Sequence, residues 1–499
     1  MVHQATKNSF FSMLSLAGLL LGGGIAGATP SPTHPGGPGE PFAGLRATQE
    51  VLGAAVLNVD TGMTFASIQA AINAASAGDT LEIQVANLPE GQVLVDRSLT
   101  LRGQTGTEVV SMAVDTGTSG DNRAWFLVNA GVDLQVRDLT FDGTGRLVWQ
   151  AFRHRGTGSF ESCRFQNIQY NPSVNYQGTA IVVLDSGDLE VRNCTFENVG
   201  RVGMLAFGAG VTSTVFENNT YIGKGGGDWL DYGFEVGGGA SATATGNSIT
   251  ACLGVASADG STSAGMLAST FFGAGTQLQV TSNLLLGNTT GLAVGFNASD
   301  TTAATAAFNR IFDNGSSGIR SDSTTAVTAE NNWWGCNDGP GAAGCDGILG
   351  SGAVDGEPWL ILSLSAAPPT LPLGGTSLLT ARVTENSDGA DTAGLGTIPD
   401  GTEILFDGAG LGPVAPPQAG TVTGLATSQL TAQNPGFGDV AAALDNQVVT
   451  TPVEILGVVA IPALGPFGLL VLAAALALAG LWLRKRTPGK PGRPFSPRT

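Results

Sequence analysis

The sequence predicts an all-β protein: a solenoid of stacked parallel strands with an N-terminal capping helix, then a β-sandwich, then one C-terminal transmembrane helix. Three observations predict this fold class. An Asn-containing strand motif returns at the interval of a solenoid coil. After Trp359 the residue pattern changes to one that predicts short strands separated by turns containing Pro and Gly. An uncharged apolar run then precedes a basic tail.

The N-terminus carries the features of an export signal. Lys7 precedes an apolar stretch, and residues 26–28 (Ala-Gly-Ala) form a small-residue cleavage site. We therefore expect residues 1–28 to be a signal peptide. Residues 29–57 are rich in Pro and Gly near their start and offer little to bury, which predicts a linker.

A short helix is expected to begin the folded β region, which we place at residues 58–360. Phe65, Ile68 and Ile72 fall on one helical face, Gly78 ends the helix, and alternating apolar residues from 81 to 85 follow as a strand. The helix would cap the first coil.

The β region repeats a motif in which an apolar marker residue is followed by a polar residue and then Asn. It returns as "SCRFQN" at 162, "NCTFEN" at 193, "STVFEN" at 213, "NLLLGN" at 283 and "NRIFDN" at 309. The markers are Phe141, Phe165, Phe196 and Phe216, spaced 24, 31 and 20 residues apart, then Leu286, Phe312 and Trp334, spaced 26 and 22 apart. Each copy is expected to bury its marker and to place Asn in a tight turn, where it can hydrogen-bond its counterpart one coil away.

This pattern resembles the right-handed parallel β-helix of the pectate-lyase superfamily over about 300 residues, and "TFASIQAAINAA" is similar to the N-terminal cap of that family. The resemblance implies a fold and no chemistry. Its catalytic signatures, a paired Asp-Asp strand followed by Gly-His-Gly or an Arg-centred lyase motif, are not found in the sequence.

The coils are expected to end near "NNWWGCNDGPGAAGCDGI". Cys336 and Cys345 bracket a Gly/Pro loop and form either a disulfide, in an exported protein, or two free thiols in a tight turn. Trp333, Trp334 and Trp359 either close the end of the core or act as sugar-stacking platforms, and we favour the first. Cys163 and Cys194 each precede a marker by two residues, which favours a buried thiol ladder over a bridge.

Residues 361–455 alternate Thr, Val and Leu with turn signals, which predicts a β-sandwich. The segments "GGTSLLTARVTEN", "PDGTEILF" and "ALDNQVV" resemble the immunoglobulin-like repeats of invasin and intimin-type bacterial surface proteins. A stalk of this kind needs no active site.

The C-terminal segment, residues 456–486, is predicted to hold a membrane span. Residues 467–483 carry no charge and would form a helix of about 26 Å, enough to cross a bilayer core. The basic tail, residues 487–499, follows Arg484, Lys485 and Arg486, so the positive-inside rule places the tail in the cytoplasm and the rest outside.

This segment resembles the IPTL-type sorting signal of Gram-negative bacteria over about 26 residues. The resemblance rests on Ile461, Pro462, Leu464, Phe467 and Gly468, followed by the apolar helix and the Arg/Lys cluster. Ala463 stands where the family usually has Thr, and Phe467 where it usually has Trp. The resemblance implies an exosortase-like partner that removes the helix and passes the ectodomain to the cell surface or matrix.

Composition disfavours nucleic acid as a partner, because the net charge is −18 and only 12% of residues are charged. Once the signal and tail are set aside, Lys224 is the only lysine and His154 the only histidine of the predicted folded region.

Two groups of residues are candidates for catalysis. Glu197 and Glu217 each follow a marker, and in a regular register they would stack at roughly 5 Å, near Arg164 or Arg192. The second group is Lys224, Asp228 and Asp231 in the loop "GKGGGDWLDYGFEVGGG". No cofactor is expected; Ca²⁺ is the metal that such carboxylates would take. The alternative for both groups is solvated carboxylates on an acidic surface.

These observations favour an exported, surface-anchored protein that binds or contributes to extracellular polysaccharide or matrix. An anchored polysaccharide lyase or glycoside hydrolase, and a structural adhesin shaft, remain the alternatives.

Overall fold

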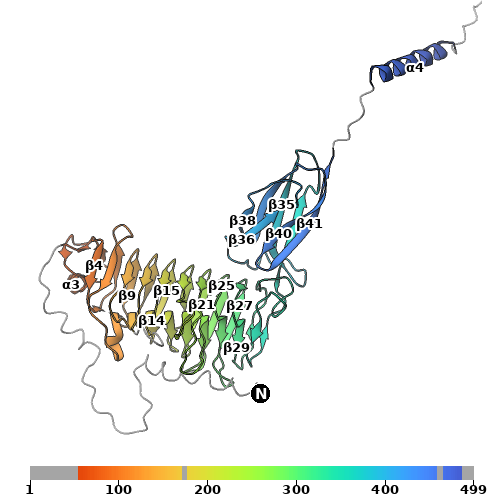
Figure 1. Cartoon of the computed structure of the whole chain (residues 1–499). Helices are drawn as coiled ribbons and strands as arrows, with labels where there is room; N and C mark the ends of the chain where they lie inside the picture. Colours follow the sequence, from red (N-terminus) through yellow and green to blue (C-terminus); the bar gives the residue numbers. More distant parts are fainter. Residues whose placement is uncertain (1–53, 171–176, 458–464, 486–499) are drawn as a thin grey trace, which may run out of the picture.

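The computed structural model describes residues 54–170, 177–457 and 465–485. Figure 1 shows a long stack of short strands, with the sandwich against the end of the stack that comes last in the sequence. The stack is a parallel β-helix, and the sandwich and a C-terminal apolar helix follow it, so the fold class predicted from the sequence is confirmed.

The described part of the β-helix contains three sheets, of 13, nine and ten strands, and each complete coil contributes one strand to each sheet. Sheet A contains β2 (Thr64–Phe65), β1 (Val56–Asn58), β3 (Thr80–Ile83), β6 (Leu99–Gly103), β9 (Asp133–Arg137), β12 (Thr157–Glu161), β15 (Asp188–Arg192), β18 (Thr214–Glu217), β21 (Ser241–Thr245), β24 (Gln277–Thr281), β27 (Ala303–Ala307), β30 (Val327–Thr328) and β32 (Val354–Asp355). Sheet B contains β4 (Asn87–Glu90), β7 (Val109–Met112), β10 (Thr140–Asp142), β13 (Arg164–Gln166), β16 (Thr195–Glu197), β19 (Thr220–Ile222), β22 (Ser248–Thr250), β25 (Leu284–Leu286) and β28 (Arg310–Phe312). Sheet C contains β5 (Val93–Val95), β8 (Ala124–Val128), β11 (Gln150–His154), β14 (Thr179–Leu184), β17 (Val202–Phe207), β20 (Tyr232–Gly237), β23 (Ala264–Ser269), β26 (Thr290–Val294), β29 (Ser317–Ser321) and β31 (Ile348–Leu349).

The marker phenylalanines of sheet B stack inside the solenoid. Phe165 pairs with Phe141 on one side and Phe196 on the other, with ring centroids 5.3 and 5.1 Å apart and all three side chains buried. The file continues as Tyr221 and Ile249. The predicted stacking of Phe165 on Phe196 is therefore confirmed.

Three other markers lie elsewhere than predicted. Phe216 lies in sheet A, paired with Val191, because the 20 residues after Phe196 do not complete a coil. Leu286 and Phe312 are the last residues of three-residue strands whose middle residue is the buried one. Their side chains therefore point away from the core, since alternate residues of a strand face opposite sides.

Asparagine side chains form a ladder at the corner between sheets A and B, just before the sheet B strands. The side-chain amide of each of Asn219, Asn247, Asn283 and Asn309 donates to the side-chain oxygen of the asparagine one coil on, at 2.8–3.1 Å, and Asn332 ends the series. All five side chains are buried, and their bonds satisfy backbone groups of the corner as well. The residue just before the first ladder position, Asn218, has positive φ, at 54°. The bond predicted between asparagines that follow the markers is formed by Asn198, which donates its side-chain amide to the side-chain oxygen of Asn167 at 2.6 Å.

The N-terminal helix α3 (Ile68–Ala74) closes the first coil. Its N-cap Ser67 accepts a hydrogen bond from the backbone N–H of Ala70 at 3.1 Å, and Ile68 and Ile72 are buried. Phe65 was expected on this helix. It belongs to β2 instead, where it packs against the same core.

The sandwich is built from a four-stranded and a five-stranded sheet in the described part of the chain. The first contains β33 (Leu360–Ala367), β35 (Thr376–Asn386), β39 (Leu425–Thr431) and β37 (Val414–Ala415). The second contains β34 (Thr370–Pro372), β41 (Gln447–Leu456), β40 (Gly436–Leu444), β36 (Glu403–Asp407) and β38 (Gln418–Gly420). The pairings are antiparallel except that of β34 with β41.

The sandwich is fixed to the last coils by buried contacts. Trp333 and Phe308 pack into the sandwich core, and Trp333 donates its indole N–H to Asp445 at 2.7 Å. Asp445 also forms an ion pair with Arg310. The expectation that Trp333 closes the solenoid is therefore wrong, because its ring turns outward; Trp334, the next residue, is buried in the solenoid core.

Cysteines divide into one bridge and three buried thiols in the described chain. A disulfide joins Cys336 and Cys345, whose Cα atoms are 5.2 Å apart. Cys163 and Cys194 are free and buried on consecutive coils, as predicted, and Cys252 is also free and buried.

Candidate functional site

A polar groove of about 500 Å³ lies on the outer face of sheet A. Three consecutive strands, β9, β12 and β15, form its floor, and their outward residues line up in three files by the strand register. The files are Asp133, Thr157 and Asp188; Gln135, Ser159 and Glu190; and Arg137, Glu161 and Arg192. The volume falls within the range of small-ligand sites.

Hydrogen bonds and ion pairs, both within a strand and between neighbouring coils, hold the side chains of the groove. Ser159 donates its hydroxyl to Gln135 at 2.5 Å, and Gln135 donates its amide to Asp133 at 2.5 Å. Arg137 pairs with Glu161 at 3.9 Å and Arg192 with Glu190 at 3.2 Å. The groove is thus a surface of paired donors and acceptors rather than an isolated carboxylate pair.

Gly158 in the floor of the groove is required by the close approach of the strands. A Cβ at this position would lie 1.9 Å from the backbone oxygen of Leu134, and φ is 144°. The absence of a side chain here keeps β12 in register between its two neighbours.

The sequence contained a signal for this groove that the marker pattern did not use. The segments "DLQVR" at 133 and "DLEVR" at 188 share an alternation in which positions one, three and five are polar. Both are sheet A strands that precede the marker strand of sheet B. Comparing the segments before each marker, as well as those after it, would have brought the two together.

Glu197 and Glu217 do not form the predicted pair. Glu197 lies in β16 of sheet B and pairs with Ile222, whereas Glu217 lies in β18 of sheet A and pairs with Arg192. Each carboxylate forms an ion pair with an arginine, Glu197 with Arg164 and Glu217 with Arg192. The predicted proximity of these arginines is correct, but the stacked carboxylates are not, because Phe216 had been assigned to the wrong sheet.

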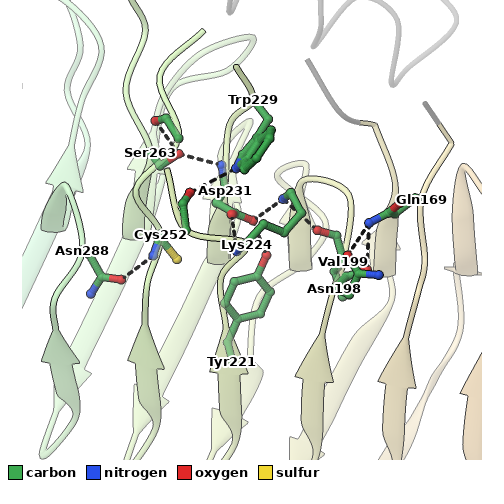
Figure 2. Close-up of polar contacts among 12 residues, drawn as sticks. Gln169, Asn198, Val199, Tyr221, Lys224, Trp229, Asp231, Cys252, Ser263 and Asn288 are labelled. Atoms are coloured by element: carbon green, nitrogen blue, oxygen red, sulfur yellow. Dashed lines mark hydrogen bonds and ion pairs between the residues drawn. The ribbon is translucent and has the colours of Figure 1, made fainter. Parts of the chain in front are cut away.

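Lys224 and Asp231 form a buried ion pair beneath the loop that joins β19 to β20 (Figure 2). The Lys224 Nζ lies 2.6 Å from Asp231 Oδ1, and their side chains are 5% and 0% exposed. Tyr221 donates its hydroxyl to the same oxygen at 2.8 Å, and the backbone N–H of Lys224 donates to Oδ2 at 2.8 Å. Lys224 also donates to the backbone oxygen of Val199, one coil away, at 2.9 Å.

Electrostatics in this pair follow from burial. Burial raises the pKa of Asp231, and the attraction of Lys224 opposes that rise. Burial lowers the pKa of Lys224, and Asp231 opposes that fall. Because neither side chain is open to solvent, the geometry assigns the pair to holding the loop rather than to contact with a polymer.

Asp228, the third member of that candidate group, is separate from the pair. It accepts hydrogen bonds from the backbone N–H of Ser257 at 2.7 Å and from the Ser257 hydroxyl at 2.5 Å. These bonds lower the pKa of Asp228. Its role in the structure is to tie two neighbouring loops together.

Among residues 54–170, 177–457 and 465–485, no cluster of three or more His, Cys, Asp or Glu side chains is arranged to hold a metal ion. The carboxylates that were candidates for Ca²⁺ are instead paired with arginine, lysine or serine.

The residues of the sorting signal are only partly described. Ile461, Pro462, Leu464 and Arg486 lie outside the described residues. Phe467 and Gly468 belong to the first turn of α4 (Pro466–Lys485), and Arg484 and Lys485 to its last turn. By length and composition α4 could cross a membrane, and none of its side chains is buried in the protein.

Comparison with known proteins identifies the solenoid. Residues 153–348 match a family model described as a right handed beta helix region. The search of curated proteins found no match. The class defined by fold and comparison is therefore a right-handed parallel β-helix protein.

Two solved structures are similar to parts of the chain at 13% identity. One is a mutant of the periplasmic alginate epimerase AlgG, with a TM-score of 0.28, covering 51% of this chain and 64% of that chain. The other is the S-layer protein SbsC domains 4 and 5, with a TM-score of 0.15, covering 21% of this chain and 56% of that chain. The chain thus spans less than two thirds of either protein.

Proposed function

We propose that this is an exported, surface-anchored β-helix protein that binds extracellular polysaccharide in the groove on sheet A. The observation that carries the proposal is the groove itself: about 500 Å³ lined by hydroxyl, amide, carboxylate and guanidinium groups in registered files. Sugar hydroxyls both donate and accept hydrogen bonds, so a surface that offers both kinds of group suits them.

Binding is favoured over cleavage by the pairing of charges. Glu161 and Glu190 each contact an arginine at the edge of the groove. A glycosidase needs one carboxyl free to donate a proton and a second facing it across the bond that breaks. The other two carboxylates of the groove, Asp133 and Asp188, accept hydrogen bonds from Gln135 and from Thr212, so each carboxylate of the groove already has a partner.

Display at the surface is the second part of the proposal. A signal peptide would direct export, α4 would anchor the chain transiently in the inner membrane, and an exosortase-like enzyme would release the ectodomain to the outer surface or matrix. The support is the apolar helix, whose last turn carries Arg484 and Lys485. Mass spectrometry of protein from the cell surface is expected to find a chain that ends before α4; a chain that retains α4 in every fraction would contradict processing.

The binding test uses the full-length chain in detergent micelles against dextran, cellulose oligosaccharides, hyaluronan and alginate. At least one is expected to bind, and Gln135→Ala is expected to weaken it about tenfold, roughly 1.4 kcal/mol. Gln279→Ala is the matched control, because Gln279 is an exposed glutamine in the same file of sheet A beyond the groove. Equal affinities of the two variants would contradict the assignment of the groove, and no binding across the panel would favour the structural shaft.

A further inference from the structure

Four phenylalanines gather on the surface at the corner where sheet C turns into sheet A. Phe207 ends β17, Phe271 and Phe272 follow β23, and Phe296 follows β26. The ring centroids of Phe271 and Phe272 are 4.0 Å apart, those of Phe271 and Phe296 are 4.8 Å apart, and those of Phe207 and Phe272 are 6.5 Å apart. The rings come from three coils and form one cluster, which we call the aromatic platform.

The platform is open to solvent. Phe272 is 46% exposed, and the other three rings are partly exposed. A cluster of large apolar rings is costly to leave in water, and such clusters on a protein surface mark places where something binds. The inward phenylalanines of sheet B, by contrast, are fully buried.

The backbone is shaped to present these rings. Phe272 has φ of 68°, a conformation that a bulky residue rarely adopts. The turn before it is held by the buried Asp300, which accepts from the Ser269 hydroxyl at 3.0 Å and from the backbone N–H of Thr270 at 2.9 Å. Strain of this kind persists where the surroundings impose it, and it concentrates at functional positions.

Glycines clear the space between the rings. On the coil between Phe207 and Phe272, β20 ends in Gly237 and is followed by Gly238 and Gly239. A Cβ at Gly238 would lie 2.7 Å from the ring of Phe207. The run "GGG" in the sequence therefore makes room for the Phe207 ring to lie across this coil.

The platform lies on the coils that follow those of the polar groove. Ser213 lines the end of the groove and lies on the same coil as Phe207, six residues later. The file Asp133, Thr157 and Asp188 begins the sheet A strands, next to the corner that the platform occupies further along the solenoid. A polymer that leaves the groove along this corner would meet the rings.

We propose that Phe207, Phe271, Phe272 and Phe296 are a stacking site for the sugar rings of the polysaccharide that occupies the groove. The inference rests on the proposed function. The faces of a pyranose ring expose C–H groups while its edge carries the hydroxyls, so a polymer of such rings fits a surface that changes from hydrogen-bonding groups to flat aromatic rings. The ligand class is a saccharide with uncharged ring faces.

The experiment measures the affinity of the full-length chain for whichever of the four named polysaccharides it binds. Phe272→Gly removes the ring and suits the positive φ, so it is expected to weaken binding at least tenfold without lowering Tm. Phe272→Trp keeps a ring and is expected to retain binding. Phe437→Ala is the matched control, because Phe437 is 70% exposed on the sandwich, and it is expected to bind as the unaltered protein does.

The outcomes separate this site from the groove. Full binding by Phe272→Gly, with weakened binding by Gln135→Ala, overturns the platform and leaves the groove in place. Absence of binding by the unaltered chain removes both. If Phe272→Gly instead abolishes a concentration-dependent self-association seen by sedimentation and leaves sugar binding intact, the rings contact a second copy and the proposal is wrong.

If Phe272→Gly lowers Tm, the Phe272→Trp variant separates stability from binding. Retained binding by Phe272→Trp supports stacking, and loss of binding by Phe272→Trp with an unchanged Tm contradicts it.

Discussion

Replacing Lys224 by Met is expected to destabilise the protein strongly at neutral pH. The substitution keeps an unbranched side chain of similar length and removes the charge that faces Asp231 at 2.6 Å. Asp231 would retain the Tyr221 hydroxyl and one backbone N–H, but its carboxylate would be buried without a cation. Removing one partner of a buried pair costs about 3–5 kcal/mol.

The deficit is expected to depend on pH. Burial raises the pKa of Asp231 from its ordinary value of 3.8, and the loss of Lys224 removes the attraction that opposes this rise. A carboxyl whose pKa is raised in the folded state loses stability as pH increases, because the unfolded chain releases the proton first. The variant should therefore be closest to the unaltered protein near pH 4 and furthest from it near pH 7.

Urea unfolding of the full-length chain in detergent, followed by tryptophan fluorescence, measures the effect. A double-mutant cycle of Lys224→Met and Asp231→Asn is expected to give a coupling energy of about 1–3 kcal/mol. The matched cycle of Arg137→Met and Glu161→Gln removes a pair whose side chains are 50% and 47% exposed, and it is expected to give only about 0–1 kcal/mol. Equal coupling in the two cycles, or a Lys224→Met protein as stable as the parent at pH 7, would refute the reasoning.

Three further outcomes follow from buried polar groups. Asn247→Ala breaks the ladder at both neighbours and is expected to cost about 1–3 kcal/mol in urea unfolding, whereas Asn446→Ala, at an exposed amide on the sandwich, should cost far less. Burial lowers the pKa of His154 from 6.5 to about 4, so stability should fall by about 3 kcal/mol as pH falls from 6.5 to 4, and His154→Phe should flatten that slope in Tm measurements. Burial raises the pKa of Glu90 from 4.5 to about 7, so its effect has the opposite sign: stability is lost as pH rises from 4.5 to 7, and Glu90→Gln should remove this loss. A pH profile unchanged by either substitution would contradict the corresponding assignment.

Several features followed from the sequence because their causes are local or periodic. The stacked file of Phe141, Phe165 and Phe196 repeats at coil length, and the asparagine ladder repeats with it. The apolar run of α4, and the alternation of Thr, Val and Leu with turn residues in the sandwich, can be read directly from the sequence. A strand or helix that is buried on one face has apolar residues at the period of that secondary structure, and this period can be read from the sequence.

Only the tertiary structure determined which sheet of the β-helix each strand belongs to. The loops between sheets vary in length, so 20 residues after Phe196 lead to Phe216 in sheet A while 25 lead to Tyr221 in sheet B. Residue spacing alone cannot assign Phe216 to sheet A and Tyr221 to sheet B, because both are buried aromatic residues in short strands. Glu197 and Glu217 do not pair because they lie in different sheets. The groove of sheet A depends on the register of β9, β12 and β15, which the sequence alone does not specify.

Contacts between distant segments were likewise set by the fold. Trp333 and Trp334 are identical neighbours in sequence, yet one enters the sandwich core and the other the solenoid core. Lys224 lies beneath its own loop, where Val199 from the previous coil accepts its hydrogen bond. The sequence by itself determined which residues repeat and which are apolar. The stacking of coils determined which side chains contact one another, because loop lengths and the packing of neighbouring coils set the position of each strand.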